Sequence, residues 1–170
     1  MGQKPTTSRH AQREERREAE FRIQMTVQRV ENFLLLSYMI GIKIDSLRLA
    51  LDCEQARLRF HDFLIMDKRS SDLDFWYACR NIECIVESDC LKTADILIQN
   101  YLKPGSRNFV SLSYNIRERI FDLITRRRNG DAVSINEIKN EFSNAEKEVL
   151  FTLASTSWLK FLQSKSYINW

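Results

Sequence analysis

The stretch that most constrains the fold is the run Leu73-Asp-Phe-Trp-Tyr-Ala-Cys79, inside a predicted helix over residues 70–87. Ser71, with Asp74 three residues later, has the spacing of a capping box, a motif that starts many helices. Apolar residues then recur every three to five positions, as on the buried face of a helix: Leu73, Trp76, Tyr77, Ile82 and Val86. The adjacent Phe75 and Trp76 carry so much apolar surface that only a packed bundle can bury it.

The chain is also poor in residues that interrupt helices. Among its 170 residues are only four Gly and two Pro, which helix interiors tolerate least. Hydrophobic residues make up 44% of the chain, enough to fill the core of one domain of this length. We therefore predict an all-α fold.

Similar patterns predict the other helices. An N-terminal helix is expected over about residues 11–36 from the stripe Ile23, Val27, Val30 and Leu34, although residues 21–27 also alternate as a strand would. Further helices are expected over residues 53–66, 90–102 and 114–128, the last with Ser113 as its N-cap. Two capping-box spacings, Ser134 with Glu137 and Ser143 with Glu146, predict two consecutive helices before a short final one near residues 158–163.

Six motifs occur in one order along the chain. They are Phe60-His-Asp-Phe-Leu64, Leu73-Asp-Phe-Trp-Tyr-Ala-Cys79, Ala94-Asp-Ile-Leu-Ile-Gln-Asn-Tyr-Leu102, Arg117-Glu-Arg-Ile120, Phe142-Ser-Asn-Ala-Glu146 and Trp158-Leu-Lys-Phe-Leu-Gln-Ser-Lys-Ser-Tyr167. Together they resemble the RGS domain, the helical module of regulators of G-protein signalling, over roughly residues 46–168. The resemblance implies an antiparallel bundle of about nine helices over residues 46–168. A helical extension over residues 21–45 and a polar tail over residues 1–20, disordered or close to a membrane, would precede it.

The resemblance also implies a function. RGS domains bind the switch regions of the GTP-bound α subunit of a heterotrimeric G protein (Gα) and accelerate its GTP hydrolysis without an active site or cofactor of their own. The family contacts Gα through a few polar positions, which hold Ser71, Asp72, Ser111, Thr152, Thr156, Ser157 and Lys160 here.

Several of these positions depart from the family pattern. Thr156 stands in place of an Asp, and a neutral acceptor forms weaker hydrogen bonds than a carboxylate. Lys160 replaces an Arg and lacks its planar fork, and Asp72 replaces an Asn. These departures leave two functions open: a weakened activator of Gα, or a scaffold module like the RGS domain of axin, which binds a peptide of another protein.

Other classes of function find little support in the sequence. There is no Gly-rich phosphate loop or Gly-x-Ser-x-Gly motif, and His10 and His61 are isolated. The four Cys form no Cys-x-x-Cys pair, so we expect no metal site and four reduced thiols in a cytoplasmic protein. A net charge of +3 does not by itself indicate nucleic-acid binding. The longest apolar run, residues 33–42, is about half as long as a membrane span of about 20 residues.

Two features bear on contact with the inner face of the plasma membrane. The start, Met-Gly-Gln-Lys-Pro-Thr6, fits the pattern for N-myristoylation of Gly2, with a solvated tail as the alternative. Arg126, Arg127 and Arg128 crowd the end of a predicted helix. There they complement the helix dipole, or offer a surface to anionic lipid or to an acidic partner.

Overall fold

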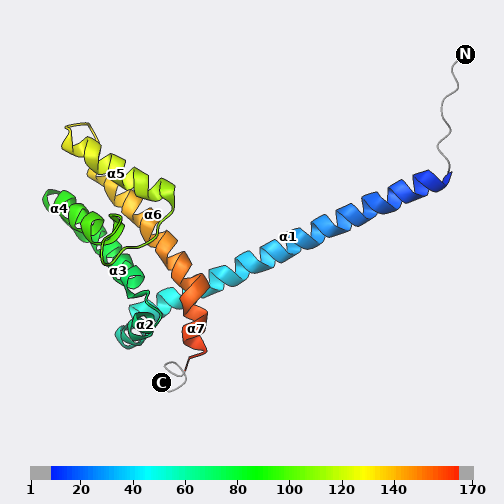
Figure 1. Cartoon of the computed structure of the whole chain (residues 1–170), viewed down its shortest axis with the longest axis horizontal. Helices are drawn as coiled ribbons and strands as arrows, with labels where there is room; N and C mark the ends of the chain where they lie inside the picture. Colours follow the sequence, from blue (N-terminus) through cyan, green and yellow to red (C-terminus); the bar gives the residue numbers. More distant parts are fainter. Residues whose placement is uncertain (1–8, 165–170) are drawn as a thin grey trace, which may run out of the picture. The chain divides into compact units, whose positions relative to one another are not determined.

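The computed structural model describes residues 9–164, and every regular element in that range is helical. The α-helices are α1 (Arg9–Asp52), α2 (Glu54–Met66), α3 (Ser70–Cys84), α4 (Glu87–Leu97), α5 (Tyr114–Arg128), α6 (Ile135–Leu153) and α7 (Leu159–Leu162). Two π-helical segments, η1 (Ile98–Leu102) and η2 (Ala154–Trp158), continue α4 and α6. The predicted all-α fold is confirmed (Figure 1).

The described residues contain seven α-helices instead of the expected nine or so. One reason is that the N-terminal extension and the first segment of the domain form a single helix, α1. Another is that α6 runs through Ser143, where the second capping-box spacing predicted a new helix. Apolar residues of α6 stay buried on both sides of Ser143, so packing favours continuing the helix over ending it.

The chain divides into two units, with the boundary after Ile42. Before that point lies the first part of α1, which is helical from Arg9 onward, so residues 21–27 belong to a helix and not to a strand. Large apolar side chains are exposed along this part of α1: Phe21, Ile23, Met25, Val27, Leu35, Tyr38, Met39 and Ile42.

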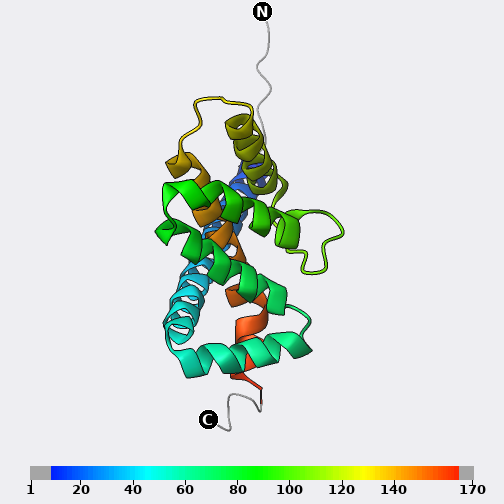
Figure 2. The same cartoon turned by 90° about the vertical axis from the view of Figure 1, so that its left-hand side faces the viewer.

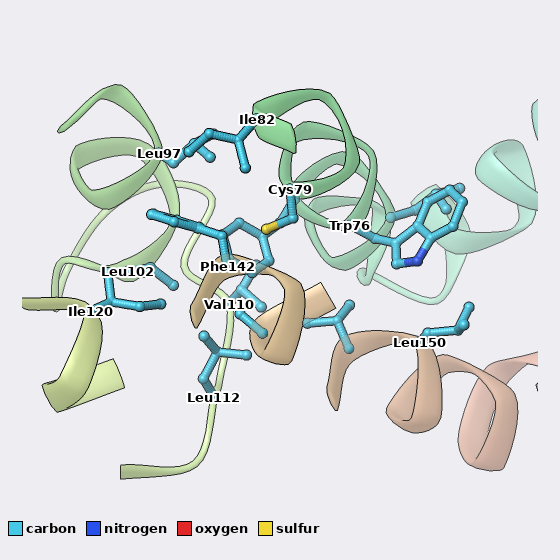
Figure 3. Packing of buried hydrophobic residues seen from close by; sticks show 14 of the residues in the cluster. Trp76, Cys79, Ile82, Leu97, Leu102, Val110, Leu112, Ile120, Phe142 and Leu150 are labelled. Atoms are coloured by element: carbon cyan, nitrogen blue, oxygen red, sulfur yellow. The ribbon is translucent and has the colours of Figure 1, made fainter. Parts of the chain in front are cut away.

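The second unit, from Lys43 onward, is a helical bundle organised around α3 and α6. α6 packs against α3 and α5, and α3 also contacts α2 and α4 (Figure 1). Figure 3 shows the core between these helices, where Trp76, Cys79 and Ile82 of α3 lie near Phe142 and Leu150 of α6.

The buried face of α3 differs in part from the predicted stripe. Leu73, Trp76 and Ile82 are buried as predicted, together with Phe75 and Cys79. Tyr77 is 47% exposed, with the guanidinium of Arg57 over its ring, and Val86 is 64% exposed because α3 ends at Cys84.

Aromatic side chains close one end of the bundle, where α2 and α7 lie near each other (Figure 2). The ring of Phe60 in α2 lies 5.3 Å from that of Trp158 and 5.2 Å from that of Phe161, between ring centroids. The indole N–H of Trp158 donates to Ser46 Oγ at 3.3 Å, which ties this end to the last turns of α1. The chain on either side of these aromatic residues therefore has a fixed position, and it forms the site described next.

Candidate functional site

The site begins at the tight connection between α2 and α3. After the C-cap of α2 at Asp67, Lys68 adopts a left-handed backbone conformation with φ of 57°. The Lys68 N–H donates to Ile65 O at 3.2 Å, and the Arg69 N–H donates to Leu64 O at 2.8 Å. This is the Schellman pattern, which satisfies the free carbonyls at a helix end. It holds Asp67 and Arg69 on either side of a sharp turn.

Arg69 joins this turn to η2, far away in the sequence. Its Nε donates to Asp72 Oδ2 at 2.8 Å, and its Nη1 donates to Thr156 Oγ1 at 2.7 Å. Thr156 in turn donates to the carbonyl of Thr152 at 2.6 Å. Asp72 and Thr156, which the family resemblance assigns to a partner interface, are therefore already bonded to each other through Arg69.

Asp67 forms a second link between the same two segments. Its Oδ2 accepts a hydrogen bond from Ser157 Oγ at 2.9 Å, and its Oδ1 lies 3.6 Å from Lys160 Nζ. Ser157 is fully buried, whereas the Lys160 side chain is 62% exposed. Asp67 thus bridges a buried hydroxyl and a solvent-facing ammonium group.

The π-helical segment η2 carries both buried and exposed residues of the site. A π turn accommodates one more residue than an α turn. Within η2, Ser157 and Trp158 are buried while Ser155 and Thr156 remain exposed. Such turns are frequent at functional sites.

A polar row along α6 connects this cluster to the loop before α5. Ser113 Oγ donates to Glu148 Oε2 at 2.7 Å, and Thr152 Oγ1 donates to the Glu148 carbonyl at 2.9 Å. Ser113 occupies the N-cap position of α5 as predicted, but its side chain binds Glu148 and does not cap the helix. Between the buried Val110 and Leu112, the side chain of Ser111 points outward, as alternation in extended chain requires.

Five of the seven predicted positions therefore meet at one end of the bundle: Asp72, Thr152, Thr156, Ser157 and Lys160. Ser111 lies two residues before the anchor at Ser113. Ser71 is half-buried in the first turn of α3 and does not start that helix, which begins at Ser70 with Arg69 as N-cap. Arg69 pairs with the carboxylate of Asp72, three residues later. This is the carboxylate that a capping box at this end of α3 would use.

Three residues of the site, Asp67, Arg69 and Glu148, were not predicted from the sequence. The spacing of Arg69 and Asp72, three apart at a helix start, was a local signal for one ion pair. The bonds of Arg69 to Thr156 and of Asp67 to Ser157 span 87 and 90 residues. No local pattern in a single sequence indicates such contacts.

The Arg126–Arg128 cluster is engaged within the fold. Arg126 pairs with Asp122 and Asp131, Arg127 donates to the carbonyl of Val133 at 2.9 Å, and Arg128 pairs with Asp95. The hydrogen bond from Arg126 to Asp131 raises the pKa of Arg126 above its usual value, and the one to Asp95 does the same for the pKa of Arg128. These contacts support a structural role for the cluster at the end of α5.

Groups of side chains typical of metal sites are not found among residues 9–164. His61 lies in a hollow of about 460 Å³ between α2, α3 and η1, with its Nε2 3.2 Å from Asp74 Oδ1. None of the helices in the described part of the chain is both long and apolar enough to cross a membrane. Gly2 and its predicted lipidation lie outside the described residues.

Comparison with known proteins identifies the type of domain that carries this site. A family model described as the regulator of G protein signaling domain matches residues 46–170. One similar protein is Regulator of G-protein signaling 1 of Xenopus tropicalis, which is 21% identical over 126 residues. That match covers 73% of this chain and 57% of the relative, so the chain spans little more than half of the relative's length.

Proposed function

The chain belongs to the family of proteins with a regulator of G protein signaling (RGS) domain, and on this premise we propose that it binds GTP-bound Gα and accelerates its GTP hydrolysis. The observation that carries the proposal is the meeting of Asp72, Thr152, Thr156, Ser157 and Lys160 at one end of the bundle. These residues come from positions 72–160, and they meet only in the folded domain.

The mechanism needs no reacting group from this chain. Gα carries its own arginine and a glutamine that orients the attacking water. A protein that binds the switch segments more tightly in the transition state than in the ground state lowers the barrier by the difference. A rigid polar surface suits this task, because its groups need no reordering when the partner binds. The hydrogen bonds of Asp67, Arg69 and Asp72 support this mechanism, because they hold polar side chains of the site in place.

The proposal is tested by single-turnover GTP hydrolysis with a panel of Gα subunits, in the presence and absence of the protein. We expect faster hydrolysis by at least one Gα, and tighter binding to Gα loaded with GDP and aluminium fluoride than to Gα loaded with GDP. Lys160→Glu should reduce both effects, whereas Lys92→Glu, at an exposed position on α4, should leave them unchanged. If no Gα is accelerated and none binds in the aluminium fluoride state, the proposal is wrong.

A second candidate is a scaffold module that binds a peptide of another protein. It is favoured by the way Arg69 holds Asp72 and Thr156, since both side chains already have partners within the domain. A scaffold of this kind would stay inert toward every Gα in the panel while remaining fully folded. The hydrolysis assay therefore distinguishes the two candidates.

We place the activity in the cytoplasm at the inner face of the plasma membrane, on the basis of the Gly2 pattern and the proposed Gα partner. One myristoyl chain binds a membrane only marginally. A second contact, such as that with Gα, would be needed for stable attachment.

A further inference from the structure

Thr156, at the position where the family pattern has an aspartate, has a hydroxyl that is largely engaged inside the domain. Its hydroxyl donates to the carbonyl of Thr152 at 2.6 Å and accepts from Arg69 Nη1 at 2.7 Å. A hydroxyl has one proton and two lone pairs, so most of its capacity is used inside the domain. The carboxylate missing from position 156 has to come from elsewhere if the site is to contain one.

Asp67 brings a carboxylate to the same place from a different helix. It lies at the C-cap of α2, and its two oxygens contact the residues that follow Thr156 in the site: Ser157 at 2.9 Å and Lys160 at 3.6 Å. Two carboxylate oxygens offer about four lone-pair sites. Ser157 and Lys160 account for two of these, and the side chain is 25% exposed, so capacity remains for a donor on a partner.

The backbone fixes this carboxylate in position. The Asp67 N–H donates to Phe63 O at 3.0 Å, and the next residue, Lys68, is held at a φ of 57°. Lys68 is the residue after the C-cap in the Schellman turn, where a left-handed conformation satisfies the free carbonyls at the end of α2. This turn holds Asp67 and Arg69, the two residues that organise the site, on either side of Lys68.

We propose that Asp67 supplies the interface carboxylate that position 156 lacks, positioning Ser157 and Lys160 and accepting hydrogen bonds from the switch segment of Gα. The inference rests on the proposed function and names the residue that determines affinity within it. Asp67 is a positioning residue toward Lys160 and a contact residue toward the partner.

The test compares Asp67→Asn, Asp67→Glu and a control, Asp62→Asn, which removes an exposed acid from the same helix. Each variant is assayed for binding to Gα loaded with GDP and aluminium fluoride, for single-turnover hydrolysis and for its thermal midpoint. A charge-assisted hydrogen bond is worth enough to make Asp67→Asn bind about tenfold to a hundredfold more weakly. Asp67→Glu, which keeps the charge, should recover a large part of the loss, and Asp62→Asn should behave as the native protein.

The outcomes separate this inference from the proposed function. If the native protein accelerates a Gα and Asp67→Asn does so equally well, Asp67 is not the interface carboxylate, although the function stands. If Asp67→Glu binds Gα as weakly as a folded Asp67→Asn, the partner does not recognise the negative charge at position 67, and the inference is wrong. If Asp67→Asn does not fold, Asp67→Ser, which also removes the charge, takes its place in both comparisons. A native protein inert toward every Gα would overturn the function, and the inference with it.

Discussion

The guanidinium of Arg69 binds Asp72 and Thr156 at the same time. From the sequence, both positions were expected to be deficits, because one lacks an anion and the other lacks a donor. In the structure the two side chains are joined through Arg69, and another anion, Asp67, lies nearby. A carboxylate introduced at position 156 would therefore pair with Arg69 within the domain, even in the absence of a partner.

This arrangement predicts a context-dependent effect of Thr156→Asp. In the native background we expect little gain in acceleration of GTP hydrolysis, since Asp67 already supplies a carboxylate and Arg69 would pair with the new one. In the Asp67→Asn background the same substitution should restore roughly tenfold in affinity, as one charge-assisted bond can. A double-mutant cycle on Gα binding measures the coupling. Equal effects of Thr156→Asp in the two backgrounds would show that the two positions act independently.

The four cysteines differ in how far they are exposed to solvent. Cys53 and Cys84 are exposed, whereas Cys79 and Cys90 are buried, and all four are free thiols. Burial, followed by the negative charge of Glu146, raises the pKa of Cys79 well above its usual value. Burial also raises the pKa of Cys90, although the positive charge of Lys139 opposes this. Because the thiolate is the reactive form, the two pairs should differ in reactivity.

We predict that two thiols per chain react rapidly with an aromatic disulfide reagent at pH 8, and four react after denaturation. The pH dependence follows from the sign of the shift. A thiol whose pKa is raised in the folded state makes its full contribution to the free energy of unfolding below the unfolded pKa of about 8.5. That contribution is lost as the pH rises through the pKa of the folded state. The thermal midpoint should therefore fall above about pH 9. Four rapidly reacting thiols in the native protein would contradict the burial of Cys79 and Cys90.

Among the helices, those with both an N-cap and a sharp end were predicted best. The bounds of α5 match the predicted residues 114–128, because Ser113 precedes an apolar stripe and Asn129-Gly130 ends it. The helix start at Ser143 was wrong, since a capping-box spacing has no effect where apolar residues continue the helix through it. The family resemblance named five positions that lie together in the structure. The pairing of those positions could not be predicted, because it depends on how α2 and η2 pack.

The two capping-box spacings give a matched pair of variants for one helix. At Ser134 the box is complete: the Glu137 N–H donates to Ser134 Oγ at 3.1 Å, and the Ser134 N–H donates to Glu137 Oε1 at 3.4 Å. Ser134→Ala should lower the free energy of unfolding by about 1 kcal/mol. Ser143→Ala, in the interior of α6, should cost nothing measurable, because Ala is the better helix former. Urea unfolding of both variants measures the difference, and equal losses would argue against a special role for Ser134.

At the scale of the whole molecule, the chain combines a domain that carries the proposed site with an N-terminal helical segment. The second unit contains every residue of the proposed interface, from Asp67 to Lys160. The first unit is part of a helix with exposed apolar side chains. Functions of the two units can therefore be tested separately.

The lipidation pattern at Gly2 gives a prediction at this scale. If Gly2 is myristoylated, the native chain should be found in the membrane fraction of cells, and Gly2→Ala should shift it to the supernatant, since it removes the acceptor for the acyl chain. Acceleration of GTP hydrolysis in solution should be the same for both forms, because Gly2 is far from the interface in sequence. Equal partitioning of the two forms would mean that residues 1–20 act as a solvated tail.

The π-helical segment η2 makes this point of the chain tolerant of a change in length. A π turn holds one residue more than an α turn. Deleting one exposed residue from η2 would therefore leave an ordinary α-helix and keep the residues after it near their present orientation. Trp158 and Phe161, which are 3% and 1% exposed, should stay in the core, and Lys160 should stay near Asp67. A deletion of Thr156 would thus remove the hydrogen bond from Arg69 while keeping the closed end of the bundle.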